Sequence, residues 1–215
     1  MTPIVPTLER ERAAWAEEQL LVGVDEVGRG PLAGPVVAAA VVFPTGCATL
    51  DGVRDSKTLP PPRRIELAAL ICDAALAIGI GAASVREIDR LNIRVATAVA
   101  MRRAVARAER MLHARVALVR ARRILLDGLP LPELGFAHEA LVDGDVFCFS
   151  IAAAGIVAKT IRDQLMARLA RRYPGYAWES NMGYGTASHH DGLRAHGLTP
   201  HHRRSFGPVA QLSVI

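Results

Sequence analysis

The sequence predicts a single α/β domain built on a mixed, five-stranded β-sheet flanked by helices, with a small helical segment at the C-terminal end. Two observations predict this class. Apolar runs of strand length follow one another at first and then alternate with longer segments of helical periodicity. Hydrophobic residues make up 51% of the 215 residues, so the chain can bury a sizeable core without disulfides or a structural metal. We expect three parts: a polar N-terminal extension (1–19), a main domain (20–172) and a C-terminal helical segment (173–215).

Each expected element has a local signal. The strands are continuous runs rich in valine, leucine and isoleucine, typical of a sheet covered on both faces; they are expected at 20–24, 36–43, 77–84, 123–128 and 146–151. Helical segments are expected at 8–19, 63–75, 87–110, 152–172 and near 186–196. The helix over 87–110 is expected to bury Ile88, Leu91, Val95, Val99 and Val105, and the helix over 152–172 to bury Ile161, Leu165 and Leu169.

Composition and charge narrow the function. Lys+Arg 26 against Asp+Glu 21 gives a net charge of +5, which favours polyanionic partners. The most apolar stretch, residues 31–43, is too short to cross a bilayer, and no secretory segment is visible at the N-terminus. The odd number of cysteines, three, without metal-ligand spacing, is typical of free thiols. We therefore expect a cytoplasmic protein with no membrane contact.

The sharpest local feature is the run Asp25-Glu26-Val27-Gly28-Arg29-Gly30 at the end of the first expected strand. Two carboxylates at the end of a buried strand are costly unless something compensates their charge. Successive strand residues point to opposite faces, so Asp25 and Glu26 cannot both serve one site through a regular strand. Glycines on both sides of Arg29 permit a ligand to approach the backbone closely. The alternative is a strand end whose acidic residues simply meet solvent.

Two further aspartates follow the same logic. Asp127 ends the fourth expected strand as Asp25 ends the first, although Asp-Gly is also a common hairpin signal. Neighbouring strands would bring both carboxylates to one edge, where ligands of α/β folds bind. Asp163 lies on the helix over 152–172, one turn after Lys159, and the two could equally form a solvated ion pair.

Polar motifs elsewhere could contact phosphates or sugars. Asp55-Ser56-Lys57-Thr58 precedes a proline run, where Asp55 or Ser56 could cap a turn and Lys57 could bind a phosphate as a compact charge. Tyr184 stands between two glycines and could stack on a sugar or base, or occupy a turn. Only two of the 26 cations are lysines, and both lie in such motifs.

Acidic residues without histidine or cysteine partners indicate a particular metal. Asp25, Glu26, Asp127 and Asp163 can share a site only if a cation neutralises them. Hard oxygen ligands select Mg²⁺ or Mn²⁺. Two such ions can activate water and stabilise the leaving oxygen in phosphodiester hydrolysis, and the surrounding cations then favour a nucleic acid as the substrate.

At these residues the chain resembles ribonuclease HII, the bacterial type 2 ribonuclease H. The resemblance runs from about residue 20 to 208 and rests on motifs in the family's order: DEVGRGPLAGPVV, DSKTL, IDRLNI, ILLDG, SIAAAGIVAKTIRD, NMGYGT and HRRSFGP. It implies a ribonuclease H-like fold in which residues 20–172 form the catalytic domain and residues 173–215 complete the substrate cleft. It also implies cleavage of the RNA strand of RNA–DNA hybrids, including single ribonucleotides embedded in duplex DNA, which leaves 5′-phosphate and 3′-hydroxyl ends.

The resemblance also implies roles for individual residues. Asp25, Glu26 and Asp127 would be ligands of Mg²⁺ or Mn²⁺, with Asp163 as the fourth acid and two ions bound during catalysis. The backbone of Gly28, Arg29 and Gly30 would sense the ribose 2′-hydroxyl, and Tyr184 would stack on the following sugar. The residues expected to hold phosphates are Ser56, Lys57, Ser150 and Lys159.

Two departures and three alternatives complete the expectations. Gly155 replaces the serine usual in the SIAAASI motif, and Leu129 follows Asp-Gly where asparagine is frequent, which concerns local hydrogen bonding rather than the reaction. Ribonuclease HIII would need a large N-terminal substrate-binding domain, for which the 24 residues before Asp25 leave no room. A catalytically silent hybrid-binding module would not need four acids. Residues 211–215 resemble a sliding-clamp-binding peptide, and the protein is otherwise expected to be a monomer.

Overall fold

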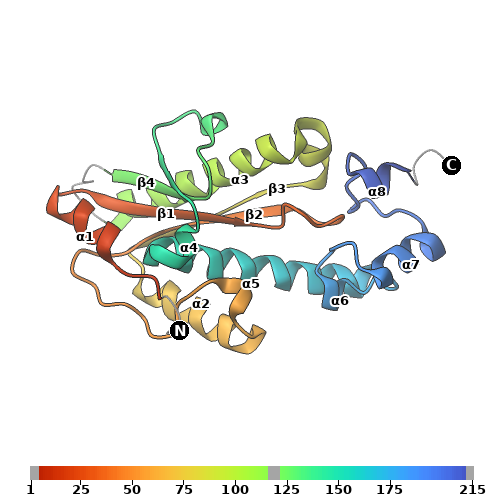
Figure 1. Ribbon diagram of the computed structural model, residues 1–215, viewed down its shortest axis with the longest axis horizontal. Helices are drawn as coiled ribbons and strands as arrows, with labels where there is room; N and C mark the ends of the chain where they lie inside the picture. Colours follow the sequence, from red (N-terminus) through yellow and green to blue (C-terminus); the bar gives the residue numbers. More distant parts are fainter. Residues whose placement is uncertain (1–4, 116–121, 212–215) are drawn as a thin grey trace.

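The computed structural model describes residues 5–115 and 122–211, and these form the expected mixed sheet (Figure 1). The strand order is β3-β2-β1-β4-β5. The central strand β1 pairs antiparallel with β2 and parallel with β4, while β3 and β5 form the edges. The bounds are β1 Leu20–Val27, β2 Val36–Val42, β3 Ala77–Ala83, β4 Arg122–Asp127 and β5 Glu139–Leu141.

The expected fifth strand is wrong in position. Residues 146–147 belong to the short helix α4 (Gly144–Phe147) and residues 149–151 to the first turn of α5 (Phe149–Arg172), while Cys148 between them forms an isolated bridge with Thr7. The fifth strand lies earlier, at Glu139–Leu141. Phe149, Ser150 and Ile151 are fully buried. A helix start enclosed by protein has the same continuous apolar pattern as a buried strand, so periodicity could not separate the two.

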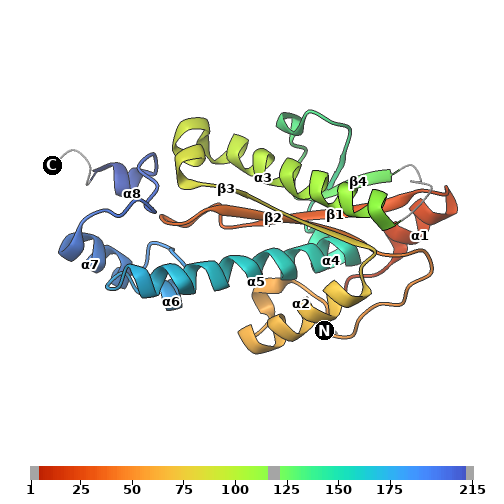
Figure 2. The ribbon, with the colours of Figure 1, turned by 180° about the vertical axis from the view of Figure 1, so that it is seen from behind.

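Helices cover both faces of the sheet (Figures 1 and 2). α3 (Val85–Arg115) packs on one face, and α5 lies on the other with α2 (Pro61–Ala74) outside it. Gly79 and Gly81 let the backbones of β3 and α3 approach closely. The α3 residues at this contact, Ala100, Ala104 and Ala108, are small and fit the narrow space. The expected contacts Leu91, Val95 and Val99 are only half-buried.

α5 also turns a different face inward than its leucine spacing predicted. Arg162, Met166 and Ala170 are buried, while Ile161, Leu165 and Leu169 are partly exposed. The reason is that the C-terminal half of α5 packs on the C-terminal segment rather than on the sheet.

The C-terminal segment contains α6 (Trp178–Asn181), α7 (Ala187–His196) and α8 (Gly207–Ala210). It has its own apolar cluster around the buried Trp178, which includes Leu32 and Ala33 from the loop between β1 and β2. The N-terminal helix α1 (Glu9–Ala16) packs beside β1 at the opposite end of the sheet (Figure 1). Among residues 5–115 and 122–211, none of the helices combines the length and apolar character that a bilayer crossing needs.

Candidate active site

The parallel pairing of β1 with β4 brings the first acidic residues together. Val24 is opposite Leu126, so the next residues, Asp25 and Asp127, emerge side by side at the carboxyl edge of the sheet. Asp25 is 9% exposed and lies on the α5 side, where its Oδ2 is 2.4 Å from the point that a Cβ on Gly155 would occupy. The glycine that departs from the family motif therefore leaves space for this carboxylate.

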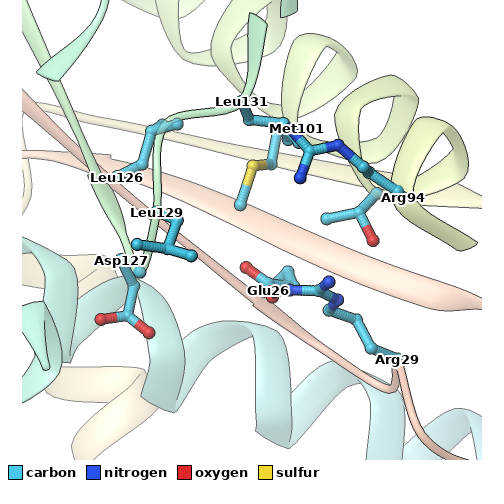
Figure 3. A pocket seen from close by; sticks show the side chains of 10 residues that line it. Glu26, Arg29, Arg94, Met101, Leu126, Asp127, Leu129 and Leu131 are labelled. Carbon is cyan, nitrogen blue, oxygen red and sulfur yellow. Dashed lines mark hydrogen bonds and ion pairs between the residues drawn. The ribbon is translucent and has the colours of Figure 1, made fainter. Parts of the chain in front are cut away.

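Glu26 points to the opposite face, as strand alternation requires. It lines a pocket of about 230 Å³ with Asp127, Arg29 and Met101, and its Oε1 is 3.3 Å from Nη1 of Arg29 (Figure 3). Glu26 is thus paired with a cation in this structure, whereas Asp25 has none bonded to it among the described residues.

The structure adds an acidic residue to this site, Asp145, that was not among the expected site residues. It is 8% exposed at the start of α4, and its charge acts on Asp25. Burial, and after it the charges of Asp127 and Asp55, raise the pKa of Asp145 to about 6. Its signal in the sequence is the run Asp143-Gly144-Asp145, which directly precedes residues 146–151, expected to be a strand.

The buried carboxylates of this site repel one another, and no cation among the described residues is bonded to Asp25. Burial raises the pKa of Asp25 well above its usual range, and Glu26 and Asp127 raise it further. Burial also raises the pKa of Glu26, although Arg29 opposes this. The pKa of Lys57 is raised because the surrounding carboxylates, first Asp55 and then Asp145, outweigh the effect of burial.

These residues fit a divalent cation. Buried carboxylates that raise one another's pKa are the donors that Mg²⁺ or Mn²⁺ needs, and no thiol or imidazole competes. Among the described residues, no group of three or more acidic, histidine or cysteine side chains is already arranged to hold an ion. Glu26 would have to leave Arg29 to join Asp25 and Asp127.

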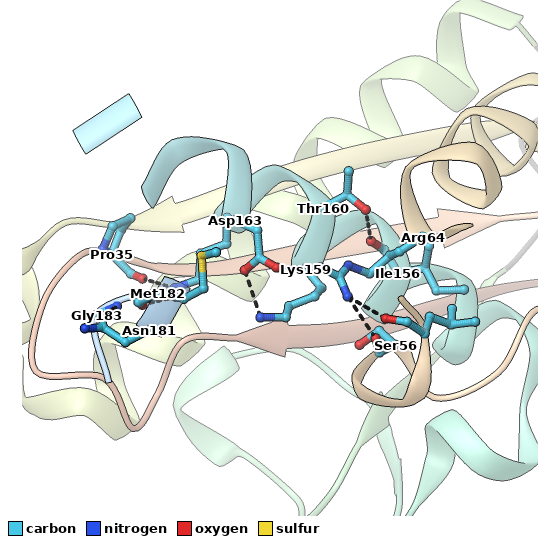
Figure 4. Close-up of polar contacts among 12 residues, drawn as sticks. Pro35, Ser56, Arg64, Ile156, Lys159, Thr160, Asp163, Asn181, Met182 and Gly183 are labelled. Carbon is cyan, nitrogen blue, oxygen red and sulfur yellow. Dashed lines mark hydrogen bonds and ion pairs between the residues drawn. The ribbon is translucent and has the colours of Figure 1, made fainter. Parts of the chain in front are cut away.

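Asp163 does not join this cluster. Gly155 touches Asp25, and Asp163 lies eight residues further along α5, about 12 Å by the rise of a helix. Its two oxygens are bonded to Arg64 (2.6 Å) and Lys159 (2.8 Å), as Figure 4 shows for the lysine. The ion pair that the sequence left open as an alternative is therefore present, and Asp145 rather than Asp163 is the further aspartate whose charge acts on Asp25.

The Arg64 ion pair connects Asp163 to the turn that carries Lys57. Nη1 of Arg64 donates to the carbonyls of Ser56 (3.3 Å) and Leu59 (3.0 Å), and the first of these contacts is drawn in Figure 4. Ser56 lies next to Gly155 and Lys57 beside the carboxylates, so both are near the acidic cluster. Asp163 thus contacts Lys159 directly, and through Arg64 it stabilises the turn that carries Lys57.

The prediction for Ser150 is wrong. Its side chain is 0% exposed, and its backbone amide and hydroxyl both donate to Oε1 of Glu11 on α1 at 2.7 Å. A phosphate cannot reach a hydroxyl that lies under α1 and is already bonded to a carboxylate.

The expected sugar-reading residues do lie together. A Cβ on Gly30 would be 3.5 Å from Cε1 of Tyr184, so the tyrosine ring flanks the Gly28-Arg29-Gly30 turn. The Leu32 amide donates to the Gly183 carbonyl at 2.8 Å and joins the two segments. Tyr184 is 46% exposed, which leaves its ring free to stack on a ligand.

The mixed five-stranded sheet, with carboxylates at the shared edge of two parallel strands and Lys57 and an open glycine turn beside them, indicates a metal-dependent phosphodiester hydrolase of the ribonuclease H-like class. The family model for ribonuclease HII matches residues 22–209. The chain is 51% identical over 212 residues to ribonuclease HII of Synechococcus sp. (strain JA-3-3Ab), covering 97% of this chain and 91% of the relative. It is 53% identical over 209 residues to that of Granulibacter bethesdensis, covering 95% and 89%.

Solved structures agree on the fold. Ribonuclease H2 from Pyrococcus horikoshii OT3 matches with a TM-score of 0.66 at 22% identity, covering 91% of this chain and 98% of that one. Bst-RNase HIII in complex with Mn²⁺ matches with 0.67 at 18% identity, covering 91% and 70%. RNase HII of Archaeoglobus fulgidus, solved with PCNA, matches with 0.64 at 23% identity, covering 86% and 93%.

The chain belongs to the ribonuclease HII family. It is a divalent-metal-dependent endoribonuclease that cleaves RNA in RNA–DNA hybrids, including ribonucleotides embedded in DNA.

Proposed function

We propose that Asp25, Asp127 and Asp145, joined by Glu26 once it releases Arg29, hold two Mg²⁺ or Mn²⁺ ions at the carboxyl edge of β1 and β4. The observation that carries this proposal is the meeting of buried carboxylates at one edge, where Asp25 and Asp127 emerge side by side and Asp127 is bonded to the backbone next to Asp145. Bound ions would supply the Lewis acidity for water attack on phosphorus and for departure of the 3′-oxygen, leaving 5′-phosphate and 3′-hydroxyl ends.

The chain's own residues would orient the substrate. Lys57 lies beside the acidic cluster, and Lys159 lies one helical turn beyond Gly155 on α5, paired with Asp163. Together with the Ser56 turn, they would bind the phosphates that flank the scissile bond. The backbone of Gly28 to Gly30 would contact the 2′-hydroxyl, and Tyr184 would stack on the next sugar, since the tyrosine ring lies directly beside this turn.

A nicking assay tests this proposal. The substrate is duplex DNA with one ribonucleotide, incubated with Mg²⁺, Mn²⁺ or EDTA, and the products are mapped by end-labelling. We expect nicking with either ion, none in EDTA, and none by Asp25→Asn. Binding without metal-dependent nicking by the wild type would favour the silent module instead.

A separate proposal concerns residues 211–215, of which only Gln211 lies within the described part of the chain. The Archaeoglobus relative has been solved with PCNA, which supports testing a clamp contact here. We expect the full chain to be retained on an immobilised bacterial sliding clamp and a chain lacking residues 211–215 to be lost. Equal retention of both would contradict the proposal.

A further inference from the structure

Two buried arginines from distant parts of the chain meet beneath the loop between β1 and β2, residues 28–35. Arg162 comes from α5, and Arg203 comes from the segment before α8. Both side chains are 0% exposed. No ion pair among residues 5–115 and 122–211 involves either one.

Both guanidinium groups donate almost entirely to carbonyls of this loop. Arg203 bonds the carbonyls of Gly34 (2.9 Å), Arg29 (2.8 Å) and Gly28 (2.5 Å). Arg162 bonds those of Pro35 (3.0 Å), Ala33 (3.1 Å) and, outside the loop, Met182 (2.9 Å). Five carbonyls of one eight-residue loop are therefore held by two side chains.

The physical consequence is mutual dependence. A desolvated cation is stable only while its donors are satisfied, so each guanidinium requires the loop carbonyls in these positions. A planar fork of several N–H donors can hold three carbonyls at once, which a lysine ammonium with a different geometry does not reproduce. Gly28 has φ +92°, and a Cβ there would lie 2.1 Å from Nε of Arg162, so the loop rests directly on the guanidinium.

The same arginines connect the two segments expected to read the sugar. Arg203 holds the carbonyls of Gly28 and Arg29, whose turn flanks the Tyr184 ring. Arg162 holds both the loop and Met182, two residues before Tyr184. The distance between the Gly28-Arg29-Gly30 turn and Tyr184 is therefore fixed by the buried side chains of Arg162 and Arg203.

We propose that Arg162 and Arg203 are positioning residues that preorganise the 28–35 loop against Tyr184 and thereby determine selectivity for a single embedded ribonucleotide. The proposal rests on the proposed sugar-reading role of this loop. Duplex DNA with one ribonucleotide presents one 2′-hydroxyl, so its cleavage requires this loop in a single register. An RNA–DNA hybrid presents a 2′-hydroxyl at every RNA position and an A-like shape along its length.

The test compares Arg162→Lys and Arg203→Lys with the wild type on two substrates, duplex DNA with one ribonucleotide and a continuous RNA–DNA hybrid of the same sequence. Exposed neighbours supply matched controls, Arg168→Lys and Arg204→Lys. We expect the ratio of kcat/KM for the single ribonucleotide to that for the hybrid to fall about 10-fold or more in the buried variants, a factor in the range seen when a supporting side chain is lost. The ratio should stay unchanged in the controls.

An equal loss on both substrates would show a merely structural role and overturn the proposal, as would an unchanged ratio. Hydrogen exchange of the wild type gives a second test that does not require a folded variant. The amides of Leu32 and Gly34, which bond Gly183 and His201, should exchange as slowly as those of the sheet core, and rapid exchange would overturn the proposal. If the wild type cleaves neither substrate, the proposed function fails, while the exchange result still decides whether the loop is preorganised.

Discussion

Oδ1 of Asp127 accepts a 2.7 Å hydrogen bond from the amide of Gly144. This contact ties the end of β4 to the start of α4, and the next residue along the chain is Asp145. Two acids 18 positions apart in the sequence are thereby held at one edge. The site consequently depends on the irregular segment before α5 as much as on the sheet.

Replacing Asp145 separates activity from stability. Asp145→Asn removes a proposed ligand, so we expect activity to fall about 100-fold or more, since even residues that only support ligands cost 10–100-fold. Without metal, the variant should be more stable by about 1–2 kcal/mol at pH 7.5, because like-charge repulsion with Asp127 and Asp55 is relieved. Nicking rates with Mg²⁺ or Mn²⁺ measure the first effect, and thermal melts in EDTA measure the second. Asp143→Asn is the exposed control, and equal activities of the two variants would refute the assignment.

Asp163→Asn should act differently from Asp127→Asn. Asp163 is bonded to Lys159 and Arg64, so its loss should disorder the phosphate-binding side and raise KM about 5- to 10-fold, an effect typical of lost substrate-binding contacts. The Mn²⁺ dissociation constant, measured by titration calorimetry, should remain that of the wild type. A dissociation constant weakened as strongly as in Asp127→Asn would restore Asp163 to the metal ligands.

The two lysines should not be replaceable by arginine. Lys159 contacts Asp163 through a single Nζ. The longer, planar guanidinium of Lys159→Arg cannot contact Asp163 and a phosphate at once with the same geometry. Lys57→Arg meets the same restriction beside four carboxylates. We expect the steady-state rate of each variant to be at least about 5-fold below that of the wild type. Arg63→Lys, at a partly exposed position of α2, is the control. Wild-type rates in both variants would contradict the compact-charge argument.

Acid should destabilise the C-terminal segment through His202. Nδ1 of His202 accepts from the Thr199 amide at 2.9 Å, and Nε2 lies 3.1 Å from Nε2 of His189. Burial, and after it the neighbouring His189, lower the pKa of His202 to about 4. The unfolded chain binds this proton below about pH 6.5 and the folded protein does not, so stability is complete above that pH and falls as the pH drops toward 4.

Thermal melts from pH 7.5 to 5 measure this effect, with an expected loss of about 2 kcal/mol from this histidine. His202→Asn should start less stable at pH 7.5 but show a flatter dependence. The exposed His113→Asn should follow the wild type. A wild-type profile that does not fall in acid would contradict the assignment of a neutral, buried imidazole.

The sequence was sufficient where the signal is local. Apolar runs located β1 to β4, and the carboxylates at their ends identified Asp25, Glu26 and Asp127 as one edge of a mixed sheet. The motif resemblance then supplied the class of reaction. These features could be predicted because the apolar pattern of a strand buried on both faces, and the acidic residues at its end, are both local in the sequence.

Tertiary structure decided the rest. Asp145 and Asp163 are both aspartates near α5, and only the packing shows that the first lies among buried acids while the second is neutralised by two cations. Ser150 became a buried partner of Glu11, and Arg162 and Arg203 became internal supports of a loop. The charge of a residue can be read from its letter. Whether that charge faces water, an ion, a carbonyl or an opposite charge depends on tertiary contacts, several of them with segments more than a hundred residues away.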